Sequence, residues 1–221
     1  MDDVLVSVEG VSRHYRRGLL DFAALANVSC QVRAGAHVAV IGPSGSGKST
    51  LIHLMAGLDQ PTQGVVRWPA LGPQVELRPD QIGIVFQTPS LLPSFTALEN
   101  VELVWLLSKQ SATQARLSAL STLKKLGLSA LADKLPDDLS GGQMQRVAVA
   151  RALVCTPRLI LADEPTGQLD RVTASKLVEA LLELAAESGA ALIVATHDPA
   201  IAGRLPTHWF MTHGKLEQRS T

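Results

Sequence analysis

Short runs of apolar residues recur along the chain, and each has the length of a β-strand. Residues 37–41, 159–162 and 191–195 are almost entirely apolar. Such runs are typical of strands covered on both faces, as in a parallel sheet. Residues 4–8 and 25–32 alternate between apolar and polar side chains, which predicts half-buried strands.

Longer segments with helical patterns lie between these runs. The predicted helices cover residues 51–56, 97–107, 112–126, 143–154 and 173–188. Gly57, Gly127 and Gly189 follow three of them and suit helix ends. Strands that alternate with helices predict an α/β fold whose sheet is mostly parallel, preceded by an antiparallel β part at the N-terminus.

The middle of the chain, residues 89–157, is almost wholly helical in pattern. We therefore expect a single domain over residues 1–221, in which residues 1–88 and 158–221 form an α/β core. The helical segment 89–157 would be a subdomain inserted into that core. Residues 83–86 predict one more short strand, and residues 209–216, centred on Gly214 and Lys215, predict a hairpin.

Composition narrows the class of protein. The 221 residues include 20 Lys and Arg against 20 Asp and Glu, a neutral balance that argues against a general nucleic-acid binder. No apolar run approaches the roughly 20 residues that span a bilayer, and the acidic N-terminus is unlike a signal peptide. Cys30 and Cys155 stand alone and are expected to be reduced, buried thiols. These features favour a soluble intracellular protein.

A glycine-rich loop follows the strand at residues 37–41. Its sequence fits the pattern G-x-x-x-x-G-K-[ST] between a predicted strand and a predicted helix, which is the context that supports a phosphate-binding loop. The loop consists of Gly42, Pro43, Ser44, Gly45, Ser46, Gly47, Lys48, Ser49 and Thr50. Backbone amides of such a loop point at phosphate oxygens, and Lys48 adds a positive charge. The Ser49 hydroxyl suits Mg²⁺.

Carboxylates end the strand at residues 159–162. Asp163 would lie near a magnesium ion held by Ser49, and Glu164 could orient and deprotonate an attacking water. His197 and Gln87 each follow a predicted strand and would reach the same edge of the sheet. Position alone leaves open whether these two residues are functional or structural.

The segment Leu139-Ser140-Gly141-Gly142-Gln143 strongly resembles the signature motif of ATP-binding cassette (ABC) ATPases. Its turn leaves amide groups free at the start of a helix, which makes it a second anion site. The resemblance covers residues 4–217 and implies an ATP-hydrolysing enzyme. It also implies a head-to-tail dimer, in which the phosphate loop of one subunit and the signature motif of the other enclose each Mg²⁺-bound ATP.

The resemblance also implies roles for individual residues. Tyr15 looks like the aromatic residue that stacks on adenine, and Gln87 looks like the glutamine that contacts Mg²⁺ and the attacking water. Asp170 resembles the aspartate contributed to the site by the partner subunit, together with Ser140–Gln143. His197 matches the histidine that contacts the γ-phosphate, and Glu164 remains the predicted base.

Two further segments are similar to exporters of the lipoprotein-releasing and macrolide type. They are residues 91–101 and residues 162–170. Gln168 and Met144 depart from this group, the stretch 64–82 is shorter than usual, and residues 19–22 are additional. The additional residues lie beside Tyr15 and could shape the adenine pocket or form a surface contact.

The family implies separate permease subunits in the membrane, contacted through a groove between Gln87 and the helical subdomain. The protein would then lie at the cytoplasmic face of the membrane, in a bacterium, and export a lipoprotein, peptide or drug-like substrate. An alternative is an ATPase of the cell-division type, which works a cell-envelope partner without cargo. An ABC ATPase of DNA repair or translation is less favoured, because the chain has one cassette, no heptad run and no net charge.

Overall fold

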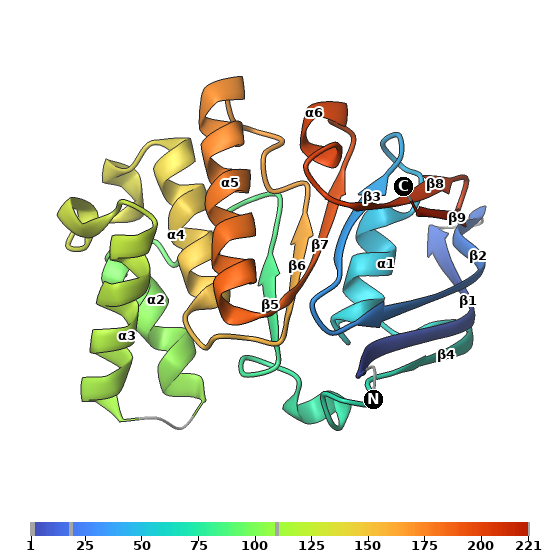
Figure 1. Cartoon of the computed structure of the whole chain (residues 1–221), viewed down its shortest axis with the longest axis horizontal. Coiled ribbons are helices and arrows are strands. Elements are labelled where there is room, and N and C mark those ends of the chain that lie inside the picture. The colour runs from blue at the N-terminus through green and yellow to red at the C-terminus, as the bar shows by residue number, and fades with distance from the viewer. Residues whose placement is uncertain (1–2, 18–19, 109–110, 221) are drawn as a thin grey trace.

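The computed structural model describes residues 3–17, 20–108 and 111–220, and it contains two β-sheets with helices between and around them (Figure 1). The first sheet is antiparallel and has the strand order β2-β1-β4. Its strands are β1 (Val4–Arg17), β2 (Leu20–Arg33) and β4 (Gln63–Arg67). The antiparallel β part predicted at the N-terminus is therefore confirmed.

The second sheet has the strand order β5-β6-β7-β3-β8-β9. Its strands are β3 (His37–Ile41), β5 (Ile82–Val85), β6 (Leu159–Asp163), β7 (Ala191–Thr196), β8 (Thr207–Thr212) and β9 (Lys215–Ser220). Neighbouring strands pair in parallel except β8 and β9, which form the predicted hairpin. The prediction of a mostly parallel sheet is confirmed.

The strands of the second sheet are apolar because both of their faces are buried. In β3, Val38 and Val40 pack into the core that contains α1 (Lys48–Met55), whereas Ala39 packs into the core on the opposite face. In β7, Ile193 packs into the core that contains α1, and Leu192 packs into the core on the opposite face. Side chains of a strand alternate between the faces of its sheet, so a strand between two cores needs apolar residues at every position.

Helices cover both faces of the second sheet. Helix α1 lies between the two sheets, and α4 and α5 lie on the other face of the second sheet, with α2 and α3 beyond α4 (Figure 1). The remaining helices are α2 (Ala97–Leu107), α3 (Ala112–Lys125), α4 (Gly141–Leu153), α5 (Arg171–Ser188) and α6 (Pro199–Ala202), with short 3-10 turns η1 (Gln74–Glu76), η2 (Ser129–Leu131) and η3 (Pro136–Asp138). Among the described residues, every helix is too short or too polar to cross a membrane.

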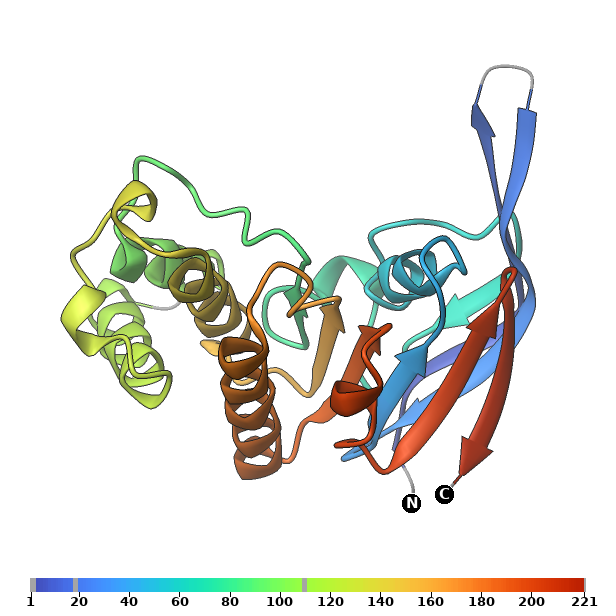
Figure 2. The same ribbon diagram turned by 90° about the horizontal axis from the view of Figure 1, so that it is seen from above.

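Strands β1 and β2 are longer than the sequence pattern predicts. Beyond the body of the protein they continue as a two-stranded ribbon that projects into solvent (Figure 2). Of its described side chains, His14, Arg16, Phe22 and Ala23 are exposed and Tyr15 is half-buried, so this part of the sequence does not alternate between apolar and polar residues. Strand β4 was not predicted, because it is a mostly exposed edge strand.

The short segment at residues 64–82 closes the end of α1. The side chains of Trp68, Gln74 and Arg78 donate hydrogen bonds to the carbonyl oxygens of Met55, Gly57 and Ala56 at the C-terminal end of that helix, at 2.7, 2.9 and 2.8 Å. Such carbonyls have no partner within a helix and need one from elsewhere. A compact segment therefore anchors the C-terminal end of the helix whose N-terminus carries Lys48.

The two cysteines are free thiols in different surroundings. Burial raises the pKa of the Cys30 thiol to about 12 and that of the Cys155 thiol to about 11. Cys155 is only half-buried, so the expectation that both thiols are buried is wrong for this residue. Thiols with raised pKa values carry little of the reactive thiolate at neutral pH.

Candidate functional site

The carboxyl ends of four parallel strands bring most of the predicted site residues to one edge of the second sheet. The register pairs Ile41 with Thr196 and Asp163 with Ala195, so the loops after β3, β6 and β7 start side by side. A cavity of about 250 Å³ lies at this edge. Its lining includes Ser44, Gly45, Gly47, Lys48, Ser49, Thr50, Gln87, Glu164 and His197.

The phosphate loop connects β3 to α1, and the protein packs tightly around its glycines. A Cβ atom at Gly42 would lie 2.3 Å from the carbonyl oxygen of Met211 in β8. One at Gly47 would lie 2.4 Å from the carbonyl oxygen of Ala24 in β2, and Gly47 has a φ of 106°. Only glycine fits such contacts and such a backbone. The loop is therefore held between β2 and β8.

Lys48 is buried within this loop and is surrounded by oxygen atoms. Its ammonium group donates to the carbonyl oxygens of Gly42 and Pro43 at 2.8 and 3.1 Å. It also forms an ion pair of 3.2 Å with Oε1 of Glu164. Since an ammonium has three protons to donate, these contacts hold it in place at the N-terminus of α1. The positive charge is aimed into the cavity.

Glu164 links the lysine to the loop after β7. Its Oε2 atom lies 2.8 Å from Nδ1 of His197, and its backbone N–H donates to the carbonyl oxygen of Ala195 at 2.9 Å. Glu164 has a φ of 46°, in the left-handed region that a residue with a side chain rarely adopts. Surrounding contacts thus hold a strained residue with its carboxylate at the mouth of the phosphate loop.

Asp163 is buried behind Glu164. Burial is the main cause that raises the pKa of its carboxyl group, and a hydrogen bond from Ser49 acts in the opposite direction. Its Oδ1 atom is buried and lacks a hydrogen-bond partner among the described residues. A buried carboxylate oxygen without a partner is costly, and a divalent cation would satisfy it. Asp163 and Ser49 therefore fit a Mg²⁺ ion.

Gln87 lies two residues beyond the end of β5 and lines the same cavity as the phosphate loop. The side chain of Gln145 in α4 donates to the carbonyl oxygen of Phe86 at 2.9 Å, which anchors the start of this loop. The Gln87 amide approaches Gly167, where a Cβ atom would lie 3.2 Å from its Nε2. The loop that carries Gln87 thus touches both α4 and the segment after Glu164.

The signature segment lies elsewhere. Ser140 caps α4: its hydroxyl accepts from the N–H of Gln143 at 3.3 Å, and the Gln143 side chain accepts from the N–H of Ser140 at 2.7 Å. Neither residue lines the cavity, and nor do Gly141 and Gly142. Amides in the first turn of a helix have no acceptor within the helix, so this turn presents N–H groups to solvent.

Asp170 is also apart from the cavity and caps α5. Its carboxylate accepts from the N–H groups of Val172 and Thr173 at 2.9 and 3.0 Å and from the Thr173 hydroxyl at 2.6 Å. The Thr173 hydroxyl is the main cause that lowers the pKa of Asp170. The first turns of α4 and α5 touch, because a Cβ atom at Gly142 would lie 2.6 Å from Cγ2 of Thr173.

Tyr15 does not line the cavity beside the phosphate loop, but Phe22 does. Sequence reasoning singled out Phe22 only as part of the additional segment 19–22, and its aromatic ring was the available signal. Leu19 lies outside the described residues. Sequence reasoning also missed Asp59, whose carboxylate accepts from the Tyr15 hydroxyl at 2.6 Å.

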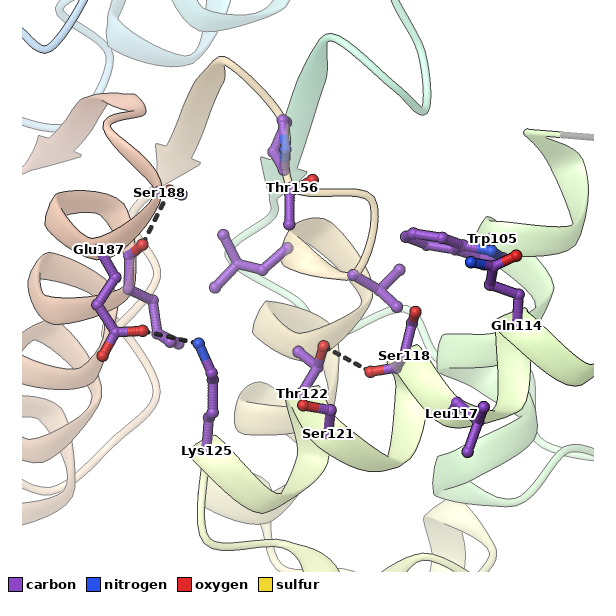
Figure 3. Close-up of a pocket in the computed structure, with 14 residues that line it drawn as sticks. Trp105, Gln114, Leu117, Ser118, Ser121, Thr122, Lys125, Thr156, Glu187 and Ser188 are labelled. Carbon is purple, nitrogen blue, oxygen red and sulfur yellow. Dashed lines mark hydrogen bonds and ion pairs between the residues drawn. The ribbon is translucent and has the colours of Figure 1, made fainter. Parts of the chain in front are cut away.

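A larger cavity, of about 510 Å³, lies between α3 and the C-terminal ends of α4 and α5. Hydroxyl groups from α3 and the ion pair of Lys125 with Glu187, at 2.7 Å, face it, and Trp105 lies at its edge (Figure 3). None of the predicted site residues lines it. Its chemistry does not resemble a phosphate site, so the candidate site is the cavity beside Lys48.

Comparison with known proteins agrees with this geometry. A family described as "ABC transporter" matches residues 25–167. The chain is 41% identical over 226 residues to the lipoprotein-releasing system ATP-binding protein LolD of Legionella pneumophila (strain Lens), which covers 99% of this chain and 100% of that protein.

Two solved structures are also similar. One is a dimeric, post-hydrolysis state of the ATP-binding cassette MJ0796 bound to ADP and Pi, with a TM-score of 0.89 and 37% identity over 97% of this chain and 98% of that one. The other is cbiO1 from Clostridium perfringens, part of the ABC transporter complex cbiONQ, with a TM-score of 0.85 and 30% identity over 99% and 89%.

Proposed function

Because the chain belongs to the ABC transporter family and is an ATP-binding subunit that hydrolyses ATP, we propose that it drives lipoprotein release through a separate membrane permease. The observation that supports lipoprotein release is the 41% identity to LolD over the whole chain, and the observation that supports an ATP-driven dimer is the presence of two candidate phosphate-binding regions in one chain. One is a buried cavity around Lys48, and the other is an exposed helix start at Ser140.

The phosphate loop binds the β- and γ-phosphates of ATP. Lys48 forms an ion pair with Glu164. An incoming phosphate offers the lysine several oxygens with a larger negative charge, so it replaces the carboxylate as the partner of the ammonium group. Glu164 is then released to act on water. Loop amides of residues 42–50 and the positive end of α1 complete the phosphate site.

Glu164 is the base. In hydrolysis the water oxygen forms a bond to the γ-phosphorus while the bond from that phosphorus to the bridging oxygen of ADP breaks. The water proton moves to the Glu164 carboxylate, and His197, 2.8 Å from that carboxylate, holds it in position and faces the γ-phosphate. Gln87 lines the same cavity and contacts the attacking water.

The buried Oδ1 of Asp163 and the Ser49 hydroxyl support a Mg²⁺ ion held by these two residues, with the Gln87 side chain as a further oxygen donor. When bound, the ion neutralises charge that develops on the phosphate oxygens. The adenine lies against the ribbon of β1 and β2, where Tyr15 and Phe22 are paired residues.

Two subunits close around two ATP molecules, head to tail. Each ATP lies between the phosphate loop of one subunit and the partner subunit's Ser140, Gly141, Gly142 and Gln143, with the partner's Asp170 beside them. The exposure of this helix start supports the arrangement, and so does the dimeric state of MJ0796. The whole chain, with residues 89–157 as its helical subdomain, acts as one ATPase domain.

The permease binds in a groove between Gln87 and the helical region. Phe86, the residue before Gln87, lines a groove of about 210 Å³ that is otherwise mostly apolar and contains two arginines, Arg78 and Arg151. Burial lowers the pKa of both guanidinium groups, and neither forms an ion pair with a carboxylate among the described residues. This chemistry fits a partner segment with an apolar face and a carboxylate. The protein would thus lie at the cytoplasmic face of a bacterial membrane.

The substitution Glu164→Gln tests the enzymatic part. It keeps the size and hydrogen bonding of the side chain but removes the base, so ATP turnover should be lost while ATP binding persists and a dimer accumulates by size-exclusion chromatography with light scattering. Turnover at the wild-type rate would overturn the assignment of the base.

Depletion of the protein from its bacterium tests the substrate. Lipoproteins destined for the outer membrane should then remain in the inner membrane, and wild-type protein, but not the Glu164→Gln variant, should restore their release. Fractionation of the two membranes measures this. Normal lipoprotein localisation after depletion would overturn the proposed substrate and leave the ATPase assignment standing.

A further inference from the structure

The cavity of about 510 Å³ between α3 and the C-terminal ends of α4 and α5 has no part in the proposed function. Thr156 and Pro157 line it just before β6 begins, and Ser188 lines it shortly before β7 begins. It therefore lies at the amino ends of these two parallel strands, whereas the cavity beside Lys48 lies at carboxyl ends. Among the described residues the two cavities share no lining residue. The larger one has the size of a small-molecule site, roughly 300–1,000 Å³.

Neutral polar groups without a partner line this cavity. The hydroxyl groups of Ser118, Ser121 and Thr156 form no hydrogen bond within the described part of the chain, although the backbone of two of these residues does (Figure 3). The charged lining residues are Lys125 and Glu187, which pair with each other at 2.7 Å. Hydroxyl groups can both donate and accept, so the cavity offers hydrogen bonds to a neutral ligand and no unpaired charge to an ion.

Two residues of the lining depart from what packing alone would favour. Thr156 has a φ of 49°, in the left-handed region that a β-branched residue rarely adopts. The indole Nε1 of Trp105, at the edge of the cavity, is buried and lacks a hydrogen-bond partner among the described residues (Figure 3). A buried indole N–H normally has an acceptor, and backbone strain gathers at ligand sites. A ligand oxygen beside the ring would supply the missing acceptor.

The rest of the lining is apolar. Leu153 and Val154 come from the end of α4, Leu184 comes from α5, and Pro157 precedes β6. These aliphatic side chains and the Trp105 ring offer a surface for carbon and hydrogen atoms, while the hydroxyl groups offer hydrogen bonds. A ligand that fits both needs one apolar face and several neutral polar groups around its edge.

We propose that this cavity binds a neutral polyhydroxylated ring, such as the hexose unit of a carbohydrate. The hydroxyl groups of the ring exchange hydrogen bonds with Ser118, Ser121 and Thr156, and its C–H face packs on the apolar lining. The bound ring touches α3, α4 and α5 together and so joins the helical segment 89–157 to a helix of the α/β core. A ligand that binds the folded chain in this way also stabilises it.

Titration of the full-length, ¹⁵N-labelled protein with methyl α-D-glucopyranoside tests the site by NMR. The indole N–H signal of Trp105, identified by its loss in Trp105→Phe, should shift and saturate, while the signals of Trp68 and Trp209 stay in place. Glycerol, which lacks the ring, and glucose 6-phosphate, which adds charge, should both bind more weakly. The measurement needs no ATP, so its failure would leave the proposed function standing.

Substitution of two hydroxyl residues locates the ligand while the Trp105 signal is kept. Ser121→Ala and Thr156→Gly should each weaken binding about fivefold, the factor that one hydrogen bond gives. Thr156→Gly also relieves the positive φ, so its thermal midpoint without ligand should not fall although its affinity does. Thr113→Ala, which removes an exposed hydroxyl of α3 outside the cavity, is the matched control and should bind as the wild type does.

Three results would overturn the proposal. One is the lack of a saturable shift of the Trp105 signal up to roughly 0.1 M glucoside, far above the ~1 mM dissociation constant of a weak complex. Another is wild-type affinity in both Ser121→Ala and Thr156→Gly. The third is binding of glucose 6-phosphate as tight as that of the glucoside, which would contradict a neutral ligand.

Discussion

The two proposed phosphate-binding regions of this chain, the loop around Lys48 and the helix start at Ser140, differ in how completely the chain alone builds them. Around the phosphate loop, Lys48 is 5% exposed and Asp163 is 7% exposed, and contacts from strands β2 and β8 hold the loop in place. At the start of α4, Ser140 is exposed, and its side-chain contact is with its own helix. The first region is organised before ligand arrives, whereas the second lacks a facing surface.

Because of this difference, we expect the first region to govern nucleotide binding and the second region to govern ATP turnover. A nucleotide can enter the region around Lys48 of a single subunit. Its phosphate there replaces the Glu164 carboxylate as the partner of the Lys48 ammonium group. The amides at the start of α4 gain a phosphate only when another molecule carries one to them. Variants that remove a phosphate contact of the first region, such as Lys48→Ala, should therefore fail at the step of nucleotide binding, and variants of the second region should bind nucleotide and fail afterwards.

The largest effect is expected from substitutions at the centre of each region. Lys48→Ala removes the buried cation, and Ser140→Arg places a bulky side chain where the partner's ATP must approach. Each variant alone should lose turnover by at least about a hundredfold, the scale for a single electrostatic contact in a reaction centre. Only Lys48→Ala should also lose ATP affinity, measured by calorimetry.

Mixing these two variants tests whether the regions meet across subunits. A mixed dimer has one site with an intact Lys48 and an intact Ser140, and one site that lacks both. Turnover should reappear on mixing, at a level that follows the fraction of mixed dimers. Mixtures that stay as inactive as their components would show that the regions do not combine across a dimer.

Asp163→Asn should separate stability from activity within the first region. Burial raises the pKa of Asp163, so the ionised form is less stable in the folded protein than in the unfolded chain. The free energy of unfolding should fall as pH rises through the pKa of this group, and the asparagine variant should lack this dependence. We expect its thermal midpoint without nucleotide to be higher by about 2–4 °C at pH 7, with turnover lost.

Differential scanning calorimetry across pH 4–8 checks the stability part, and phosphate release checks the turnover. The matched variant is Ser49→Ala, which removes the hydrogen bond that favours ionised Asp163 and should lower stability. A lower midpoint for Asp163→Asn at pH 7 would contradict the view that the buried carboxylate is a cost until Mg²⁺ arrives.

The first region could largely be predicted from sequence, for a physical reason. A buried strand, a glycine-rich loop and a helix start each impose residue types on consecutive positions, so His37–Ile41 and the loop after it carry their own signal. The ion pair of Lys48 with Glu164 could not be predicted, since it depends on how two strands far apart in sequence lie in one sheet.

The ribbon formed by β1 and β2, by contrast, could not be predicted from the sequence. Residues beyond the body of β1 and β2 have no buried face, so neither the strand ends nor the exposure of Phe22 leave a periodic pattern. The resemblance to the family identified Tyr15 as the residue that stacks on adenine. Its contact with Asp59 could not be predicted, because tertiary structure decides which side chains meet.

Gly141→Ala probes the exposed region with a smaller change. A Cβ atom at Gly141 would have no atom within 4 Å, so the folded subunit accepts alanine and should gain up to about 1 kcal/mol in stability from it. The added methyl group would lie between the helix start and the partner's phosphate. Turnover should therefore fall about tenfold to a hundredfold, with ATP affinity of the single subunit unchanged.

Gly142→Ala is the contrast to this variant, because its Cβ atom would lie 2.6 Å from Thr173. It should lower the thermal midpoint, unlike Gly141→Ala. If Gly141→Ala has wild-type turnover, the amide of this residue does not face a phosphate.

The smallest effect concerns Asp170, whose carboxylate caps α5 in this chain. Asp170→Ala removes the cap and should lower the free energy of unfolding by about 1 kcal/mol, whereas asparagine caps a helix as well as aspartate does. Asp170→Asn should therefore keep the stability of the wild type in chemical denaturation. If this variant also keeps wild-type turnover, Asp170 acts as a cap alone. A loss of turnover without a loss of stability would instead show that the charge of Asp170 acts at the nucleotide site of the partner subunit, a site that one chain alone does not complete.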